Sequence, residues 1–258
     1  MARYKIILAY DGTHFLGSQR QATSRTVQGE LEKALSRLGW EGKTVYLAGR
    51  TDTGTHASGQ VAAFDLDWHH SANQLQKALN TLLPCDIAAR KIEVVPEGFH
   101  PRFDARLRHY QYRLYIAEVR DPLRERYAWR VWPDVLDLTP LAAIWTGTHD
   151  FVAFGTPLRT QGSTLRTVLF AKWQNQGDEW TFDIIANAFL YRMVRRLVYV
   201  QVAVGQGRLS AGTLVHALGT RSGSSRKVDK PDQPRIPANL APASGLTLVE
   251  VFYDNFIK

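Results

Sequence analysis

Hydrophobic and polar residues in the first 105 positions follow the two periods that distinguish strands from helices. Apolar or alternating stretches predict strands over residues 4–10, 44–47, 60–66 and 86–95. Apolar residues at helical spacing predict one helix capped by Thr26, and a second that begins near Ser71 and ends at Pro84. The predicted order is therefore β-α-β-β-α-β, the ferredoxin-like arrangement that RNA-recognition modules share.

The second half of the chain predicts the same order of elements. Its expected strands cover residues 108–116, 164–174, 179–186 and 246–253. Its expected helices cover residues 139–145, with Thr139 as the cap, then 188–204 and 210–218. Residues 120–132 are rich in arginine and aromatic residues but only weakly periodic, which predicts a loop.

These patterns predict an α+β fold with two domains, residues 1–105 and 106–258, each a ferredoxin-like, RRM-like half. The two halves are expected to form a mostly antiparallel central sheet flanked by helices. Residues 219–237 are rich in Ser, Arg, Lys and Pro and poor in apolar residues, which predicts a mobile basic segment. The aromatic string with which RNA-recognition domains stack bases is absent.

Composition places the chain among ordinary soluble globular proteins. Of its 258 residues, 45% are hydrophobic and 22% are charged, and no apolar run reaches the length of a membrane span. The N-terminus lacks the pattern of a signal peptide. Cys85 is the single cysteine, which excludes an intrachain disulfide framework and fits a reducing compartment. We therefore expect a cytoplasmic protein without a membrane partner.

The formal net charge is +8, and arginine predominates among the 32 cationic residues. A guanidinium group matches phosphate oxygens and stacks on bases, so this bias favours a nucleic-acid partner. By net charge alone, a protein that binds nucleic acid and a basic protein that binds none are about equally well supported. In the predicted helix 188–204, Arg192, Arg195 and Arg196 lie opposite the apolar face, where a solvated surface is the plainer interpretation.

The segment 47–57, Leu-Ala-Gly-Arg-Thr-Asp-Thr-Gly-Thr-His-Ala, lies between two predicted strands. It carries one carboxylate, Asp52, one guanidinium, Arg50, and two glycines. Loops on rigid strands are common places for catalytic groups. The same residues are also ordinary turn chemistry, and the segment by itself favours the turn.

Other kinds of site are excluded or weak. Residues 39–44 have two residues between their glycines where a phosphate-binding loop needs four, and they lead into a strand. The eight histidines and one cysteine show no zinc-binding spacing, and residues 205–207 lack the third glycine of a dinucleotide site. Asp65 and Asp67 share one strand face and leave a magnesium-dependent phosphoryl-transfer enzyme open, although a solvated face is the plainer interpretation.

Ordered motifs along nearly the whole chain resemble the tRNA pseudouridine synthases of the TruA type. Each motif is weak evidence, but their joint order is very specific. The matching segments are Tyr10-Asp11-Gly12, Gln19-Arg20-Gln21, Thr26-Val27-Gln28-Gly29-Glu30-Leu31, Gly49-Arg50-Thr51-Asp52, Gly54, His56-Ala57, Leu83-Pro84, Asp86-Ile87, Phe99-His100, Arg102-Phe103, Tyr110, Tyr112, Ala186-Asn187-Ala188-Phe189, Met193-Val194-Arg195, Ala241-Pro242 and Gly245-Leu246.

The resemblance implies a role for particular side chains. Asp52 resembles the catalytic aspartate, and Tyr110 resembles the tyrosine that packs on the uracil and helps to move the C5 proton. Arg195 resembles the arginine that pairs with the catalytic carboxylate, and Leu246 a residue of the uracil pocket. RNA binding is implied for Arg50, which would fill the space of a flipped-out nucleotide, and also for Arg20 and Arg102.

The resemblance also implies the reaction, an isomerisation of uridine to pseudouridine in the tRNA anticodon stem-loop, around positions 38 to 40. The reaction needs no group donor, no metal and no cofactor, and the family members are homodimers that bind tRNA. A carboxylate can add to the base or the sugar, or stabilise the charge formed on glycosidic cleavage, and the sequence leaves these routes open. Removing a base from its stack costs a few kcal/mol, which Arg50 would help to recover.

Three departures from the family pattern stand out. Ser18 occupies a position where the family usually has tryptophan, and Thr53 and Thr55 replace small or apolar residues beside the aspartate. The basic segment 219–237 is longer than expected. Two alternative hypotheses remain beside the isomerase: a non-catalytic RNA-binding protein with RRM-like halves, and the phosphoryl-transfer enzyme built on Asp65 and Asp67.

Overall fold

The computed structural model describes residues 1–132, 135, 137–157, 162–219 and 236–253. It divides into two compact units, Met1–His109 with Thr247–Lys258, and Tyr110–Leu246. The expected α+β fold with mostly antiparallel pairing is confirmed. The division into folding domains at residues 105 and 106 stays a prediction. Most of the segment 219–237 lies outside the described residues.

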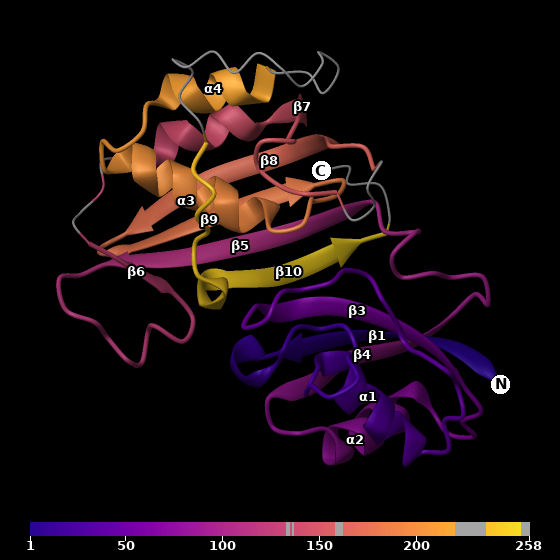
Figure 1. Cartoon of the computed structure of the whole chain (residues 1–258). Helices are drawn as coiled ribbons and strands as arrows, with labels where there is room; N and C mark the ends of the chain where they lie inside the picture. Colours follow the sequence, from indigo (N-terminus) through magenta and orange to yellow (C-terminus); the bar gives the residue numbers. More distant parts are fainter. Residues whose placement is uncertain (133–134, 136, 158–161, 220–235, 254–258) are drawn as a thin grey trace. The chain divides into compact units, whose positions relative to one another are not determined.

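The first unit combines a sheet with the helices α1 and α2 (Figure 1). Its elements are β1 (Ala2–Tyr10), the 3₁₀ helix η1 (Gly12–His14), α1 (Val27–Ser36), β2 (Tyr46–Leu47), β3 (His56–Leu66), α2 (Ala72–Leu82), β4 (Ile87–Val95) and β10 (Leu246–Phe252), of which Leu246 is counted with the second unit. β1 pairs antiparallel with both β3 and β4. The other edge of β3 pairs with β2 near Ala62 and, in parallel, with β10 near His56.

Local sequence accounts for these elements. Along β1, alternation buries Tyr4, Ile6, Leu8 and Tyr10 on one face. Thr26 caps α1 by accepting a hydrogen bond from Gly29, as predicted. The predicted start of α2 is also confirmed, because Ser71 and Gln74 bond to each other's backbone in a capping box.

The second unit comprises a sheet with helices packed on it (Figure 1). Its elements are β5 (Leu107–Ile116), which begins in the first unit, β6 (Trp129–Val131), the 3₁₀ helix η2 (Thr139–Trp145), β7 (Gly147–Asp150), β8 (Leu165–Gln176), β9 (Glu179–Ala186), α3 (Met193–Gly205), α4 (Ala211–Gly219) and the 3₁₀ helix η3 (Ala243–Gly245). The strand order is β5-β9-β8-β7. The core joins β8 to α3 directly, since the buried Trp173 Nε1 donates to Gln201 Oε1 at 2.8 Å.

Several predicted boundaries in this unit were wrong. The helix predicted over 188–204 begins at Met193, because Arg192 adopts a left-handed conformation with φ +62°. Thr139 lies inside η2 and does not cap it. The predicted loop 120–132 contains β6, which pairs in parallel with β5, and β7 was not predicted.

Among the described residues, no helix is long and apolar enough to cross a membrane.

Candidate active site

The segment 48–55 forms a turn that presents Asp52 at the start of β3. The Thr55 N–H donates to the Asp52 carbonyl at 3.1 Å, and Gly54 at the third position has φ +78°. A positive φ there is typical of a type II turn and favours glycine. The turn interpretation of this segment therefore describes its backbone, and the same turn gives Asp52 a defined direction.

Asp52 is partly buried, between the buried Thr51 and the exposed Thr53. Arg50, two residues earlier, is exposed. Within the described parts of the chain, no hydrogen bond or ion pair to the Arg50 guanidinium is found. One short loop thus presents a carboxylate near the protein surface and a guanidinium that is available to a ligand.

Thr51 is held from several sides by buried polar groups. Its N–H donates to Ser18 Oγ at 2.8 Å, and its carbonyl accepts from the Ser18 N–H at 3.2 Å. Its hydroxyl lies 2.9 Å from the Tyr10 hydroxyl. The buried Gln60 pairs with both backbone groups of Gly49, at 3.3 and 2.9 Å. The backbone before Asp52 is therefore fixed by side chains from two strands and another loop.

The motif Tyr10-Asp11-Gly12 packs directly on this turn. A Cβ atom at Gly12 would lie 2.0 Å from the Thr55 carbonyl oxygen, so only glycine fits. The Gly12 N–H donates to His56 Nδ1 at 3.0 Å, and Asp11 Oδ1 lies 3.3 Å from the same nitrogen. This contact joins the end of β1 to the beginning of β3.

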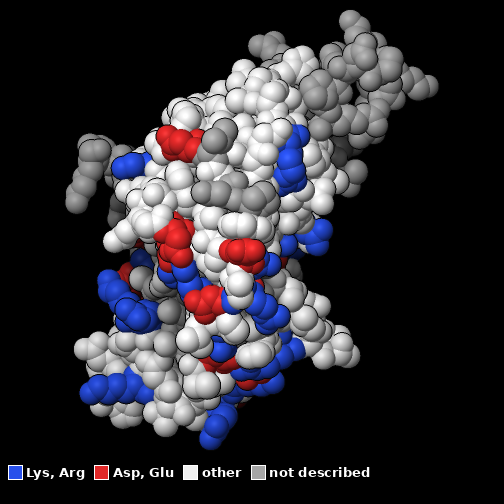
Figure 2. Space-filling view, turned by 90° about the vertical axis from the view of Figure 1, so that its left-hand side faces the viewer, with Lys and Arg blue, Asp and Glu red and all other residues white. Residues whose placement is uncertain are grey.

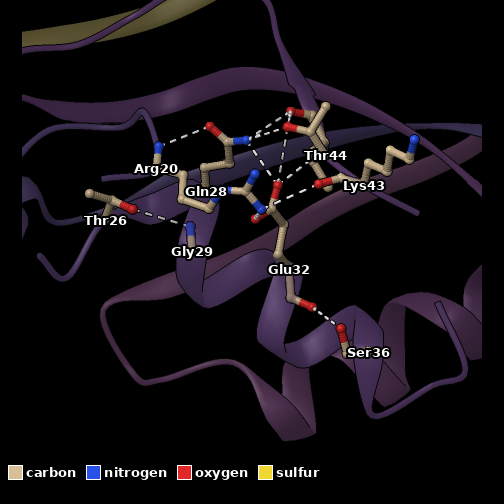
Figure 3. A network of polar contacts seen from close by, with 9 residues as sticks. Arg20, Thr26, Gln28, Gly29, Glu32, Ser36, Lys43 and Thr44 are labelled. Atoms are coloured by element: carbon tan, nitrogen blue, oxygen red, sulfur yellow. Dashed lines mark hydrogen bonds and ion pairs between the residues drawn. The ribbon is translucent and has the colours of Figure 1, made fainter. Parts of the chain in front are cut away.

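Arg20 belongs to a polar network between α1 and the residues around β2 (Figure 3). Its Nη1 donates to Glu32 Oε2 at 2.8 Å and to the Lys43 carbonyl at 3.3 Å. Glu32 is 6% exposed and also accepts from the Val45 N–H and from Gln28 Nε2. Arg20, predicted to bind RNA, thus neutralises a buried carboxylate.

Arg102 lies in the turn before β5 and is exposed. Its N–H donates to His100 Nδ1, and its carbonyl accepts from Arg108. No described residue forms an ion pair with its guanidinium. On the face shown in Figure 2, Lys and Arg side chains alternate with Asp and Glu. This face is therefore of mixed charge, although the chain carries a net charge of +8.

The second unit places Tyr110 and Leu246 at its hydrophobic core. Tyr110, on β5, is partly buried and packs edge-on against Phe189, with ring centroids 5.1 Å apart. Leu246 is 7% exposed and belongs to the same core cluster on which Tyr110 packs. An aromatic face beside apolar side chains is suited to a flat base.

Arg195, on α3, is tied to the segment that leads into β10. Its Nε donates to the Ala241 carbonyl at 2.7 Å, and its own carbonyl accepts from the Ala241 N–H. In the same segment the Pro242 carbonyl accepts from the hydroxyl of Tyr112, whose pKa is raised by burial. Arg195 is half-buried, so the solvated face predicted from periodicity does not describe it.

The predicted site residues fall in both units. Asp52, Arg50, Arg20 and Arg102 belong to the first unit, and Tyr110, Arg195 and Leu246 to the second. The convergence of Asp52 with Tyr110 and Arg195 stays a prediction. The sequence analysis did not identify Tyr10 and Gln60 as part of the loop's support. Gln60 carried a signal that could have been used, because it is an amide within an apolar strand.

Asp65, one of the two residues of the magnesium alternative, accepts from Arg3 Nη1 at both carboxylate oxygens, at 2.8 and 3.0 Å. Asp67 lies beyond the end of β3, near the N-terminal amine. Among the described residues, no group of three metal-binding side chains occurs. The contact of Asp65 with Arg3 gives the phosphoryl-transfer hypothesis no support.

Comparison with known proteins decides the family. The model of the tRNA pseudouridine synthase family matches residues 6–104 and 141–254, which include Asp52 and Arg195. The chain belongs to this family. The resemblance seen in the motifs is confirmed, and the protein is an enzyme that isomerises uridine.

Relatives match over nearly their whole length. "tRNA pseudouridine synthase A" of Geobacillus sp. (strain WCH70) is 37% identical over 98% of this chain and 99% of its own. The protein of the same name from Chloroflexus aurantiacus is 40% identical, over 98% of this chain and 89% of its own. "tRNA pseudouridine synthase A 1" of Bacillus cereus is 36% identical over 99% and 100%. Such coverage argues against a non-catalytic RNA-binding protein.

Proposed function

We propose that the protein converts uridine to pseudouridine in the anticodon stem-loop of tRNA, around positions 38 to 40, with Asp52 as its catalytic carboxylate. The observation that carries this proposal is the turn at residues 52–55, in which hydrogen bonds hold the backbone next to Asp52. This turn lies inside the region that the family model matches. The relatives' names, tRNA pseudouridine synthase A, support tRNA as the substrate.

The reaction breaks the bond between C1′ and N1, turns the base and joins C1′ to C5, after which the proton on C5 is lost and N1 takes up a proton, so that product and substrate are isomers. Asp52 acts on the flipped uridine, either as a nucleophile or by stabilising the charge formed on cleavage. Arg195 pairs with this carboxylate and keeps it ionised beside the base. Tyr110 stacks on the uracil and helps to move the C5 proton, and Leu246 lines the apolar wall of the pocket.

Arg50 fills the gap that the flipped nucleotide leaves in the stem. Its exposed guanidinium, which has no partner among the described residues, supports this role. A planar guanidinium can stack on bases and donate to phosphates at the same time. Arg102 binds the phosphate backbone, which positions the RNA without reading its sequence.

The protein acts in the cytoplasm as a homodimer that binds tRNA across its surface. Arginine-rich composition and a net charge of +8 support attraction to a polyanion.

The test is to map pseudouridines in unmodified tRNA transcripts after incubation with the purified protein. We expect modification confined to positions 38 to 40, without added metal and in the presence of a chelator. A stem-loop in which these uridines are replaced by cytidines is the control. Modification at other positions would contradict the proposed specificity, and tRNA that is bound but never modified would contradict the proposed activity.

A further inference from the structure

The backbone on the N-terminal side of Asp52 is held by three side chains outside the segment 48–57. Tyr10 ends β1, Ser18 lies in the loop after η1, and Gln60 lies in β3. Ser18 and Gln60 are 0% exposed and Tyr10 is 5% exposed. We infer that Tyr10, Ser18 and Gln60 are positioning residues for the isomerisation, which hold Gly49 and Thr51 and thereby fix the directions of Arg50 and Asp52.

The hydrogen bonds of these three residues form one connected chain that meets at Thr51 and Gly49. Gln60 Nε2 donates to the Gly49 carbonyl at 2.9 Å and to the Tyr10 hydroxyl oxygen at 3.4 Å. The Tyr10 hydroxyl is also hydrogen-bonded to the Thr51 hydroxyl at 2.9 Å, and either oxygen can be the donor. Burial raises the pKa of Tyr10 to about 12, so the phenol keeps its proton at neutral pH.

Ser18 completes the support through both backbone groups of Thr51. Its hydroxyl accepts from the Thr51 N–H at 2.8 Å, and its own N–H donates to the Thr51 carbonyl at 3.2 Å. A Cβ atom at the neighbouring Gly17, which has φ +87°, would lie 3.0 Å from the same carbonyl oxygen. Glycine at position 17 therefore allows the two loops to approach closely.

The loop that carries Ser18 is itself anchored to α1. The Gln28 N–H donates to the Ser18 carbonyl at 2.9 Å, and Gln28 Oε1 accepts from the Arg20 N–H at 2.9 Å. Gln28 in turn is oriented by the buried Glu32 (Figure 3). The catalytic turn is thus connected by hydrogen bonds to the rigid helix, through Ser18 and Gln28.

These contacts act on the rate of reaction more than on binding. A displacement of about 1 Å in a catalytic group can cost on the order of 100-fold in rate. None of the three side chains is exposed enough to bind a macromolecule. Removing one of the hydroxyl groups should therefore lower the rate of the bound complex and leave the affinity for tRNA nearly unchanged.

The inference rests on the proposed function and is tested with two hydroxyl deletions and matched controls. Tyr10→Phe is compared with Tyr4→Phe, since Tyr4 is buried on the same face of β1 but stacks on Phe64. Ser18→Ala is compared with Ser36→Ala, since the Ser36 hydroxyl donates to the Glu32 carbonyl within α1, away from the turn at residues 52–55. For each variant, the single-turnover rate on saturating tRNA, the Kd for tRNA and the exchange of the Thr51 amide proton are measured.

We expect Tyr10→Phe and Ser18→Ala to lower the single-turnover rate about 10- to 100-fold, with a Kd within about threefold of wild type. Ser18→Ala should also speed exchange of the Thr51 amide, whereas both controls should match wild type. Rates equal to those of the controls, or a loss confined to Kd, would overturn the inference. If the wild-type protein isomerises no uridine, the proposed function fails, and amide exchange still decides whether Ser18 holds the turn.

Discussion

The Arg20 guanidinium lies 2.8 Å from the Glu32 carboxylate, which is 6% exposed. A buried carboxylate without a cation is strongly unfavourable, because its desolvation is not compensated. Arg20 therefore contributes to the stability of the first unit, independently of any contact with RNA. This separates it from Arg50 and Arg102, with which the family resemblance groups it.

Replacing Arg20 should destabilise the protein. We expect Arg20→Ala to lower the free energy of unfolding by about 2 kcal/mol, because Glu32 loses a charged hydrogen-bond donor while staying buried. Urea denaturation measures this change. Arg50→Ala, which removes an exposed guanidinium, is the control and should stay within about 0.5 kcal/mol of wild type. Equal, small effects of both variants would contradict the role of Arg20.

Arg50 and Arg102 should affect RNA binding and leave stability unchanged. Each contact between an arginine and a phosphate contributes about one unit to the slope of log K against log salt concentration. We therefore expect Arg50→Ala and Arg102→Ala each to reduce this slope by about one, with unchanged Tm. Filter binding of tRNA between low and high salt measures the slope. A slope identical to that of wild type would exclude the altered residue from the RNA interface.

Thr55 is a departure from the family pattern that should cost stability. Its Oγ1 is buried and has no hydrogen-bond partner among the described residues, and the residue is 2% exposed. We expect Thr55→Val to raise the free energy of unfolding by about 1 kcal/mol, because an unsatisfied buried hydroxyl is replaced by a methyl group of similar size. Calorimetry should show a Tm higher by roughly 2–4 °C.

The control for this substitution is Thr53→Val, since Thr53 is exposed in the same turn. It should leave Tm unchanged. A Thr55→Val variant that is less stable than wild type would mean that the hydroxyl has a partner in solution.

Acid should weaken the contact between Arg25 and Asp86. Two hydrogen bonds from Arg25, at 2.7 and 2.8 Å, hold the pKa of Asp86 below its usual value. Because the pKa of Asp86 is lower in the folded state, the contact contributes its full stabilisation at pH values above the unfolded-state pKa of about 4. This stabilisation is lost as the pH falls through the pKa of the folded state. Asp86→Asn should therefore be about 1 kcal/mol less stable than wild type at pH 7, and the difference should vanish near pH 2.

Urea denaturation at several pH values checks this pH dependence. Asp67→Asn, which alters an exposed carboxylate, should show no comparable dependence. A difference between wild type and Asp86→Asn that is constant from pH 7 to pH 2 would contradict the assignment.

Local chemistry explains which elements were predictable from sequence. Thr26 and Ser71 are strong helix caps followed by apolar residues at helical spacing, and both helices begin where the sequence places them. The turn at Gly177 was predictable because glycine supplies the positive φ of +66° between β8 and β9. In each of these cases the signal lies within a few residues of the feature that it determines.

Features that depend on distant contacts were not predictable. The left-handed conformation of Arg192 ends the extended segment before α3, although arginine has no local preference for it. β6 forms because Trp129–Val131 pairs with β5, and its own periodicity is too weak to indicate a strand. Pairing of Arg20 with Glu32 joins a loop to a helix twelve residues later, which no residue pattern specifies.

The residues of the candidate site fall into the same two classes, those that the sequence indicates and those that only distant contacts reveal. The family motifs named Asp52, Arg50, Tyr110, Arg195 and Leu246, but motifs do not show which groups hold the turn at residues 52–55. Ser18 is the clearest example, because the sequence marks it only as a departure from tryptophan. In the structure its hydroxyl accepts the Thr51 N–H next to Asp52. The residues that hold this turn are identified only by their hydrogen bonds in the structure.

The most direct test of the account uses tRNA that carries tritium at C5 of its uridines. Formation of pseudouridine replaces the hydrogen on C5, so each turnover releases tritium to water. We predict release by the wild-type protein and a loss of at least about 1,000-fold for Asp52→Asn, which keeps the size of the side chain but removes its charge and nucleophile. Asp52→Asn should bind tRNA as tightly as wild type. Undiminished release by this variant would contradict the central claim that Asp52 is the catalytic carboxylate.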